Sequence, residues 1–102
     1  MHELESLRLE VREFSRKRNW EEFHRPKNLV MALSVEVAEL MEHFQWRTQE
    51  ESEALDEAAR EEVSLEMADI LLYLVRMADV LDVDLYSAAK RKLEYNAARF
   101  PE

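Results

Sequence analysis

The complete absence of glycine constrains the fold of this chain more than any other feature of its sequence. Among 102 residues there is no Gly and there are only two Pro. Glycine supplies the unusual backbone angles of the tight turns that join the strands of a sheet. Ala, Leu, Glu and Arg, which favour helices, are frequent instead. The sequence therefore predicts an all-α protein, and its length predicts a single domain over residues 1–102.

Apolar residues recur at helical spacing in four segments, which predicts a fold of the four-helix bundle type. The expected helices span about residues 2–19, 28–47, 57–81 and 84–99. Pro26 marks the boundary before the second helix, Asn28 is its expected N-cap, and Asp84 is the expected N-cap of the fourth. The acidic segment between the second and third helices is either a loop or one short helix.

The third helix is apolar on nearly every side between Met67 and Leu81. Such a helix lies at the centre of a bundle or between subunits. In a chain this small the second arrangement is attractive, so we expect a homo-oligomer.

Two pairs of carboxylates stand in the most hydrophobic segments of the chain. Glu36 and Glu39 belong to the second helix, and Glu66 and Asp69 to the third, each pair three residues apart. Asp69 has little polar company in its segment, and a buried carboxylate must be paired, protonated or bound to a cation. If the two helices pack antiparallel, the four acids converge.

Oxygen ligands in a chain without Cys and with three His indicate Mg²⁺ or Mn²⁺ rather than Zn²⁺. Four acids suggest two or more ions on a polyphosphate, with one acid free to orient water. Two alternatives remain at this point. Acids at this spacing are common on solvated helix faces, and a di-iron bundle requires ExxH pairs, for which Glu21 with His24 is a weak candidate.

Two further groups of residues point to a ligand. Lys92, Asn96 and Arg99 form a stripe of phosphate-type donors on the fourth helix, although cations also favour helix C-termini for electrostatic reasons. Trp20 and Trp46 lie near helix ends, where they can stack a nucleobase or serve as ordinary packing residues.

The composition argues against several classes of protein. A net charge of −9 makes a nucleic-acid-binding surface a poor expectation. The sequence has no long uncharged apolar run of a membrane helix and no signal-peptide core, so we expect no membrane partner. The lack of Cys fits a cytoplasmic protein.

Three segments of the chain carry a family resemblance. They read NWEEFHRPKNLVMALSVEVAELMEHFQW, EEVSLEMADILLYLVRMADVLDVDL and KRKLEYNAARFP. These segments resemble the MazG-like nucleotide pyrophosphohydrolases of the all-α NTP pyrophosphatase superfamily, and within them the small dCTP pyrophosphatase branch. The resemblance covers about residues 4–101. It implies Mg²⁺-dependent hydrolysis, with Mn²⁺ as a substitute, between the α- and β-phosphates of a nucleoside triphosphate. It also implies a dimer, or more often a tetramer built as a dimer of dimers, in which a site can draw on two subunits.

The resemblance implies a role for each candidate residue. The metal ligands and catalytic acids are Glu36, Glu39, Glu66 and Asp69, and the base-stacking residues are Trp20 and Trp46. The phosphate and nucleotide contacts are Tyr73, Lys92 and Asn96, followed by Lys27 and Arg99. The animal dCTP-specific members carry a pocket His where this chain has Val11, so a strict cytosine preference does not follow.

The resulting hypothesis is a pyrophosphohydrolase of a pyrimidine deoxynucleotide such as dCTP, which clears unwanted nucleotides from the pool. One alternative keeps the fold and changes the substrate to dUTP or to a modified or damaged nucleotide. Another is a non-catalytic acidic scaffold whose third helix drives oligomerisation.

Overall fold

The structure, a computed structural model, describes residues 2–102 and contains five helices within them. They are α1 (Glu3–Lys17), α2 (Pro26–Glu42), α3 (Gln49–Glu53), α4 (Glu57–Val80) and α5 (Leu85–Arg99). The described residues form no strand, which confirms the predicted all-α class. The acidic segment between α2 and α4, expected to be either a loop or one short helix, contains the short helix α3. None of the helices between residues 2 and 102 combines the length and the apolar character needed to cross a lipid bilayer.

Two of the expected helix boundaries test the capping rules. Asp84 is the N-cap of α5 and accepts a hydrogen bond of 3.0 Å from the Ser87 amide, as predicted. The prediction for α2 is wrong, because this helix begins at Pro26 with Arg25 as its N-cap. Proline fits the first helical turn, where its fixed φ is already helical and its missing N–H is not needed. Asn28 instead donates from Nδ2 to the Phe23 carbonyl at 3.1 Å.

The second helix also ends earlier than expected. Its last helical residue is Glu42, and residues 43–47 form turns instead of a further helical turn. Thr48 then starts α3 with a capping box, in which its hydroxyl accepts from the Glu51 amide and the Glu51 carboxylate accepts from the Thr48 amide.

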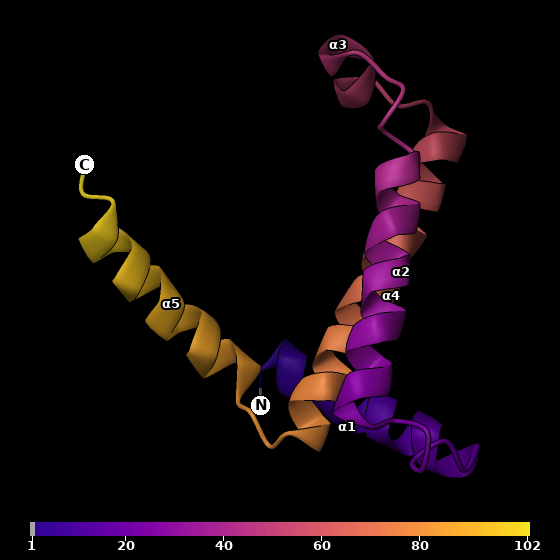
Figure 1. Cartoon of the computed structure of the whole chain (residues 1–102), viewed down its shortest axis with the longest axis vertical. Coiled ribbons are helices and arrows are strands. Elements are labelled where there is room, and N and C mark those ends of the chain that lie inside the picture. Colours follow the sequence, from indigo (N-terminus) through magenta and orange to yellow (C-terminus); the bar gives the residue numbers. More distant parts are fainter. Residues whose placement is uncertain (1) are drawn as a thin grey trace.

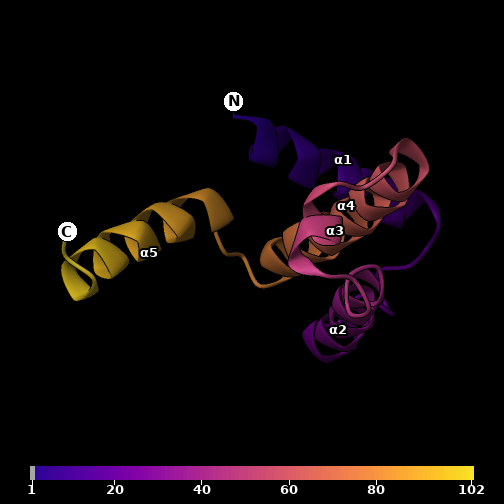
Figure 2. The ribbon, with the colours of Figure 1, turned by 90° about the horizontal axis from the view of Figure 1, so that it is seen from above.

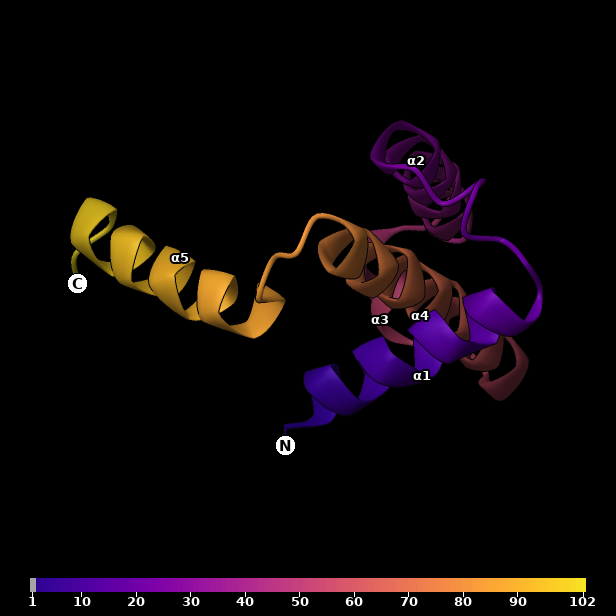
Figure 3. The ribbon, with the colours of Figure 1, turned by 90° about the horizontal axis from the view of Figure 1, so that it is seen from below.

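Helix α4 is the centre of the fold. It forms an antiparallel hairpin with α2, joined through α3, and α1 packs on its other side (Figures 1 and 2). Helix α5 follows α4 but points away from this three-helix body, as the view from below also shows (Figure 3). A single chain therefore packs three of its four long helices together.

The chain closes its helix ends without glycine by using Asn and Asp. Asn19, after α1, has a φ of 56°, and Asp82, after α4, has a φ of 54°. These are the non-glycine residues that adopt left-handed backbone angles most readily. Both stand where a helix usually ends in glycine, which explains how a chain without Gly still turns sharply.

The single chain leaves much apolar surface uncovered. Its buried apolar side chains are Leu29, Val63, Val75 and Ala78. Large apolar side chains remain exposed along α2, α4 and α5, among them Val35, Met41, Leu65, Met67, Leu93 and Phe100. Soluble monomers rarely expose apolar surface on this scale, so a partner is expected to cover it.

Candidate active site

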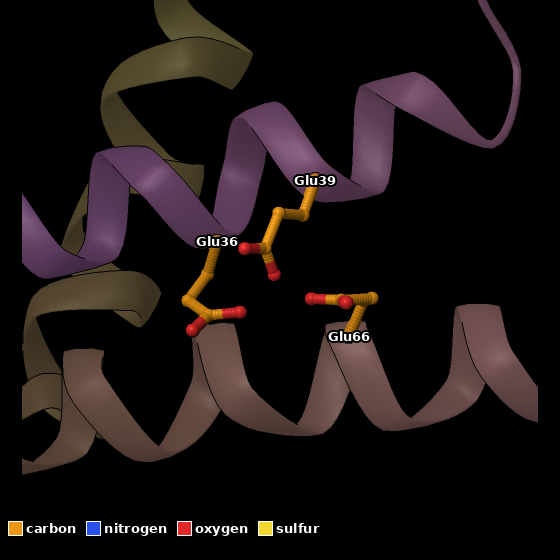
Figure 4. Close-up of side chains that lie close together, drawn as sticks. All are labelled: Glu36, Glu39 and Glu66. Atoms are coloured by element: carbon orange, nitrogen blue, oxygen red, sulfur yellow. The ribbon is translucent and has the colours of Figure 1, made fainter.

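Three of the four predicted acids converge between α2 and α4. Glu36 and Glu39 project from α2 toward Glu66 on α4 (Figure 4), and one carboxylate oxygen of each lies within 4.8 Å of the others. This convergence follows from the antiparallel hairpin. Residues three apart on α2 share a face, and that face meets the corresponding turn of α4.

The fourth predicted acid, Asp69, lies beside this group but outside it. Its side chain is exposed in the single chain, so the expectation of a buried Asp69 is wrong for this structure. The Asp69 charge nevertheless contributes to raising the pKa of Glu36, and both residues line the same cavity. The acidic cluster, as we use the term below, is Glu36, Glu39 and Glu66, with Asp69 at its margin.

The electrostatics of the acidic cluster match a cation site. Desolvation, followed by the nearby carboxyl groups of Glu66, Glu39 and Asp69, raises the pKa of Glu36 from 4.5 to about 7. Among the described residues, Glu36 Oε2 and Glu66 Oε2 are buried without a hydrogen-bond partner. Buried oxygens of this kind need a proton or a cation. Because every donor is a carboxylate oxygen, the cluster suits Mg²⁺ or Mn²⁺.

The same helix faces continue one turn beyond the cluster. His43, after α2, lies with Nδ1 at 3.9 Å from Glu62 Oε2 on α4. The Glu62 side chain is 69% exposed, so this contact is at the surface. Glu62 thus marks where the converging acids give way to solvated ones.

A cavity of about 460 Å³ opens next to the acidic cluster, between α1, α2 and α4. Its walls are mostly apolar and aromatic, with Trp20, Phe14 and Tyr73 among them, and Glu36 and Asp69 lie at one side. The Trp20 ring packs edge-on against Phe14 at 5.7 Å between ring centroids. The predicted base-stacking Trp20 and the predicted nucleotide contact Tyr73 therefore share one cavity with two of the predicted acids.

The second predicted stacking residue, Trp46, is not part of this cavity. Its side chain is 87% exposed and follows the C-terminal end of α2, whereas Trp20 precedes the N-terminal end of that helix. At 1.5 Å per residue, the 17 residues of α2 separate the two ends by about 25 Å. Within one chain, the two tryptophans cannot hold the same base.

The predicted phosphate contacts also divide between two regions. Lys27 lies in the first turn of α2 and is exposed. Lys92, Asn96 and Arg99 lie on α5, which points away from the hairpin that carries the acidic cluster (Figure 1). Within one chain, the structure does not bring the three α5 residues to the acids.

Sequence reasoning missed a polar network behind the cavity. Asp79 accepts hydrogen bonds from three guanidinium groups: Arg8 at 2.5 Å, Arg12 at 2.9 Å and Arg76 at 2.9 Å. Arg76 also donates from Nε to His24 Nδ1 at 3.0 Å. The signal was present, since Arg76 is the one basic residue between Met67 and Leu81 of the most apolar helix, and a buried charge requires partners.

Known proteins are similar to this chain over nearly its whole length. Over 100 residues the chain is 44% identical to dCTP pyrophosphatase 1 of Bos taurus and 43% identical to that of Homo sapiens, covering 96% of this chain. The chain spans 59% of the length of these curated relatives. A solved pyrophosphatase from Archaeoglobus fulgidus superposes with a TM-score of 0.92 at 42% identity, covering 100% of this chain and 95% of that one.

The sequence profile of the MazG-like family matches residues 31–102, which include the hairpin apart from the first five residues of α2, all four acids and α5. The match covers well over half of the chain. Together with the relatives above, it confirms the family indicated by the sequence motifs: the chain belongs to the MazG-like family.

Proposed function

We propose that this protein is a metal-dependent nucleoside triphosphate pyrophosphohydrolase. It converts a deoxynucleoside triphosphate, with a pyrimidine such as dCTP as the favoured substrate, to the monophosphate and pyrophosphate. The observation that carries the proposal is the shared cavity, whose lining combines Trp20 with the carboxylates of Glu36 and Asp69. An aromatic ring for the base and acids for metal-bound phosphates match the two halves of a nucleotide. The names of the similar proteins, dCTP pyrophosphatase and pyrophosphatase, support the same reaction.

The acidic cluster would hold the metal. Glu36, Glu39 and Glu66 would supply the ligand oxygens, and Asp69, at the margin of the cluster, would be the fourth ligand. A bound Mg²⁺ or Mn²⁺ would offset the triphosphate charge and polarise the α-phosphoryl group. Without such a cation, the acids would repel the substrate.

The remaining steps belong to side chains of the chain itself. Glu36 or Glu39 orients the attacking water. Trp20 stacks the base inside the cavity. Tyr73, on the cavity wall, contacts the nucleotide between the base and the phosphates.

The proposed site needs a second copy of the chain. Helix α5 has 15 residues, a length that is marginal for an isolated helix in water, and it packs against neither α2 nor α4 to any extent. We infer that α5 of one subunit docks on another, bringing Lys92, Asn96 and Arg99 to phosphates bound at the partner's acidic cluster. Trp46 would reach the base from a neighbouring subunit in the same way. The assembly is then a dimer or a dimer of dimers, with the tetramer favoured.

The physiological proposal is removal of unwanted deoxynucleotides in the cytoplasm. Val11 lines the cavity where the resemblance to animal dCTP-specific members implies a histidine. Moderate promiscuity among pyrimidine deoxynucleotides, with dUTP and modified nucleotides as further substrates, is therefore part of the proposal.

A pyrophosphate-release assay over all canonical nucleotides, with and without Mg²⁺, tests the reaction directly. We expect Glu66→Gln to abolish release while leaving the helical content unchanged, because it removes one ligand charge from the cluster. Glu62→Gln is the matched control, since Glu62 lies one turn away on the same helix and is 69% exposed. If Glu66→Gln retains activity, the assignment of Glu66 as a metal ligand is refuted.

The same preparation separates the enzyme from a non-catalytic scaffold. For the enzyme, Mg²⁺ with a nonhydrolysable deoxynucleotide raises the melting temperature, because both bind only the folded state. A scaffold shows no such rise and releases no pyrophosphate from any nucleotide.

A further inference from the structure

The cavity beside the acidic cluster has one polar wall that the proposed chemistry does not use. Besides Glu36 and Asp69, its lining includes Ser15, His24 and Arg76. Ser15 and Arg76 are the buried polar residues of the described chain, at 1% and 7% exposure. A cavity that stacks a base on Trp20 thus places buried polar groups within reach of the base edge.

Arg76 is held in this wall by two fixed partners. Nε donates to His24 Nδ1 at 3.0 Å, and Nη1 donates to Asp79 Oδ2 at 2.9 Å. The side chain of Arg76 is 8% exposed, so the guanidinium plane is set by packing as well as by these bonds. Within residues 2–102, Nη2 has no hydrogen-bond partner and is not among the fully enclosed orphan atoms. Arg76, a residue that lines the cavity, therefore keeps one guanidinium nitrogen without a partner among the described residues.

The partner His24 keeps Arg76 in this orientation. Burial, and then the adjacent Arg76 charge, lowers the pKa of His24 below 6.5, so the ring is neutral at neutral pH. A neutral imidazole with a free Nδ1 lone pair accepts the Nε–H of Arg76, which a protonated ring cannot do. The histidine of the FHRP segment, part of the first segment that carries the family resemblance, thus belongs to the lining of the cavity.

We propose that Arg76 is a specificity-determining residue, which donates a hydrogen bond from Nη2 to the O2 carbonyl oxygen of a pyrimidine base stacked on Trp20. The inference rests on the proposed function and adds the base-recognising group to it. Arginine carries only donors and does not lose its proton, so it selects a base edge that presents an acceptor. Every pyrimidine nucleotide presents O2 next to its glycosidic bond, which fits the promiscuity expected among pyrimidines.

A substrate lacking O2 tests the inference. We compare dCTP with an aminopyridine C-deoxynucleoside triphosphate, which keeps the amino group and ring nitrogen of cytosine but has no O2. The wild-type protein is expected to prefer dCTP by roughly 10- to 100-fold in kcat/KM, the range for a hydrogen bond to a charged donor. In Arg76→Met this preference falls to within about 3-fold, mainly through KM for dCTP.

Arg12→Met is the matched control. Arg12 donates to the same Asp79 carboxylate, at 2.9 Å from its Nε, but does not line the cavity. We expect it to keep the preference for dCTP. If Arg76→Met does not fold by circular dichroism, Arg76→Gln takes its place. The wild-type comparison also stands alone, because equal kcat/KM for the two substrates overturns the inference.

Binding separates this inference from the proposed reaction. Isothermal titration with the α,β-imido forms of both nucleotides, in Mg²⁺, measures recognition without turnover. If the wild type binds the imido form of dCTP more tightly than the other nucleotide and Arg76→Met removes this preference, the inference is supported. This holds even if no pyrophosphate is released, because the lack of release would refute only the proposed reaction. A loss of binding that is equal for both nucleotides in Arg76→Met, or no binding of either by the wild type, overturns it.

Discussion

Replacing Glu36 by Gln is expected to stabilise the metal-free protein while abolishing its activity. The pKa of Glu36 rises from 4.5 to about 7 through desolvation and the neighbouring acids. The folded state therefore binds a proton over this range that the unfolded state does not, and stability falls as the pH rises through it. The full shift corresponds to about 3.4 kcal/mol. Because solvent reaches the cluster and screens it, we expect roughly half, about 1–2 kcal/mol.

Urea denaturation at fixed protein concentration, in the presence of a chelator, measures this difference. At about pH 8, Glu36→Gln should be more stable than the wild type by about 1–2 kcal/mol, and below about pH 4.5 the two should be nearly equal. Millimolar Mg²⁺ should then stabilise the wild type, because the cation offsets the repulsion among the acids, and should stabilise the variant much less. Comparing variant with wild type cancels the titration of the groups outside the acidic cluster.

Two results would refute this reasoning. Equal stability of the two proteins at about pH 8 without metal would show that the acids do not repel one another in solution. Equal stabilisation of both by Mg²⁺ would show that the cation binds elsewhere. Glu62→Gln serves as the control for a simple change of net charge, since it lies on the same face of α4 and is mostly exposed.

Three further predictions address the other parts of the molecule. Hydrogen bonds from Arg12 and then Arg8 lower the pKa of Asp79 from 3.8 to about 2. This carboxylate therefore stabilises the fold above about pH 4 and loses its effect as the pH falls toward 2. Asp79→Asn should lower the free energy of unfolding by about 2 kcal/mol in urea denaturation at neutral pH, and no loss of stability would refute the role of the network. Trp20→Ala should weaken nucleotide binding by about 1–3 kcal/mol, read as a higher KM for dCTP, whereas an unchanged KM would exclude stacking there. If Lys92 acts on the partner's site, mixing inactive Glu66→Gln and Lys92→Ala subunits should restore roughly a quarter of wild-type activity. Half of the dimers then contain one subunit of each variant, and one of the two sites in each mixed dimer is intact. No recovery after subunit exchange would place Lys92 in its own subunit's site.

The sequence predicts the acidic cluster well because the cluster depends on helical periodicity alone. Residues three apart share a helix face, and a short polar connection between two long helices brings them together antiparallel. Glu36, Glu39 and Glu66 therefore meet once the hairpin forms. Asp84 is a cap that can be recognised from sequence for the same reason, since its role depends only on the next few residues.

The errors arise where tertiary contacts decide the outcome. Asn28 is a good N-cap residue, but Pro26 starts the helix earlier and leaves the Asn28 side chain to bond the Phe23 carbonyl. Helical periodicity cannot distinguish a start at Pro26 from a start at Asn28, because both positions precede the same apolar stripe. The sequence indicates that the buried Arg76 needs partners, but it does not identify His24, which lies 52 residues away and meets Arg76 only through packing.

Three separate features of the single chain have one explanation in the proposed assembly. Helix α5 points away from the other helices and packs along none of them within residues 2–102. Helix α4 keeps Leu65 and Met67 exposed although it lies at the centre of the fold. Trp46 is exposed and lies beyond the end of α2 that is far from the cavity. A second hairpin packed antiparallel against the first, about a two-fold axis perpendicular to α2 and α4, exchanges the two ends of the hairpin. Such an axis would bring Trp46 of one subunit toward the Trp20 end of another while covering the exposed apolar residues. A parallel arrangement would cover the same residues but keep the two tryptophans about 25 Å apart, so the position of Trp46 favours the antiparallel one.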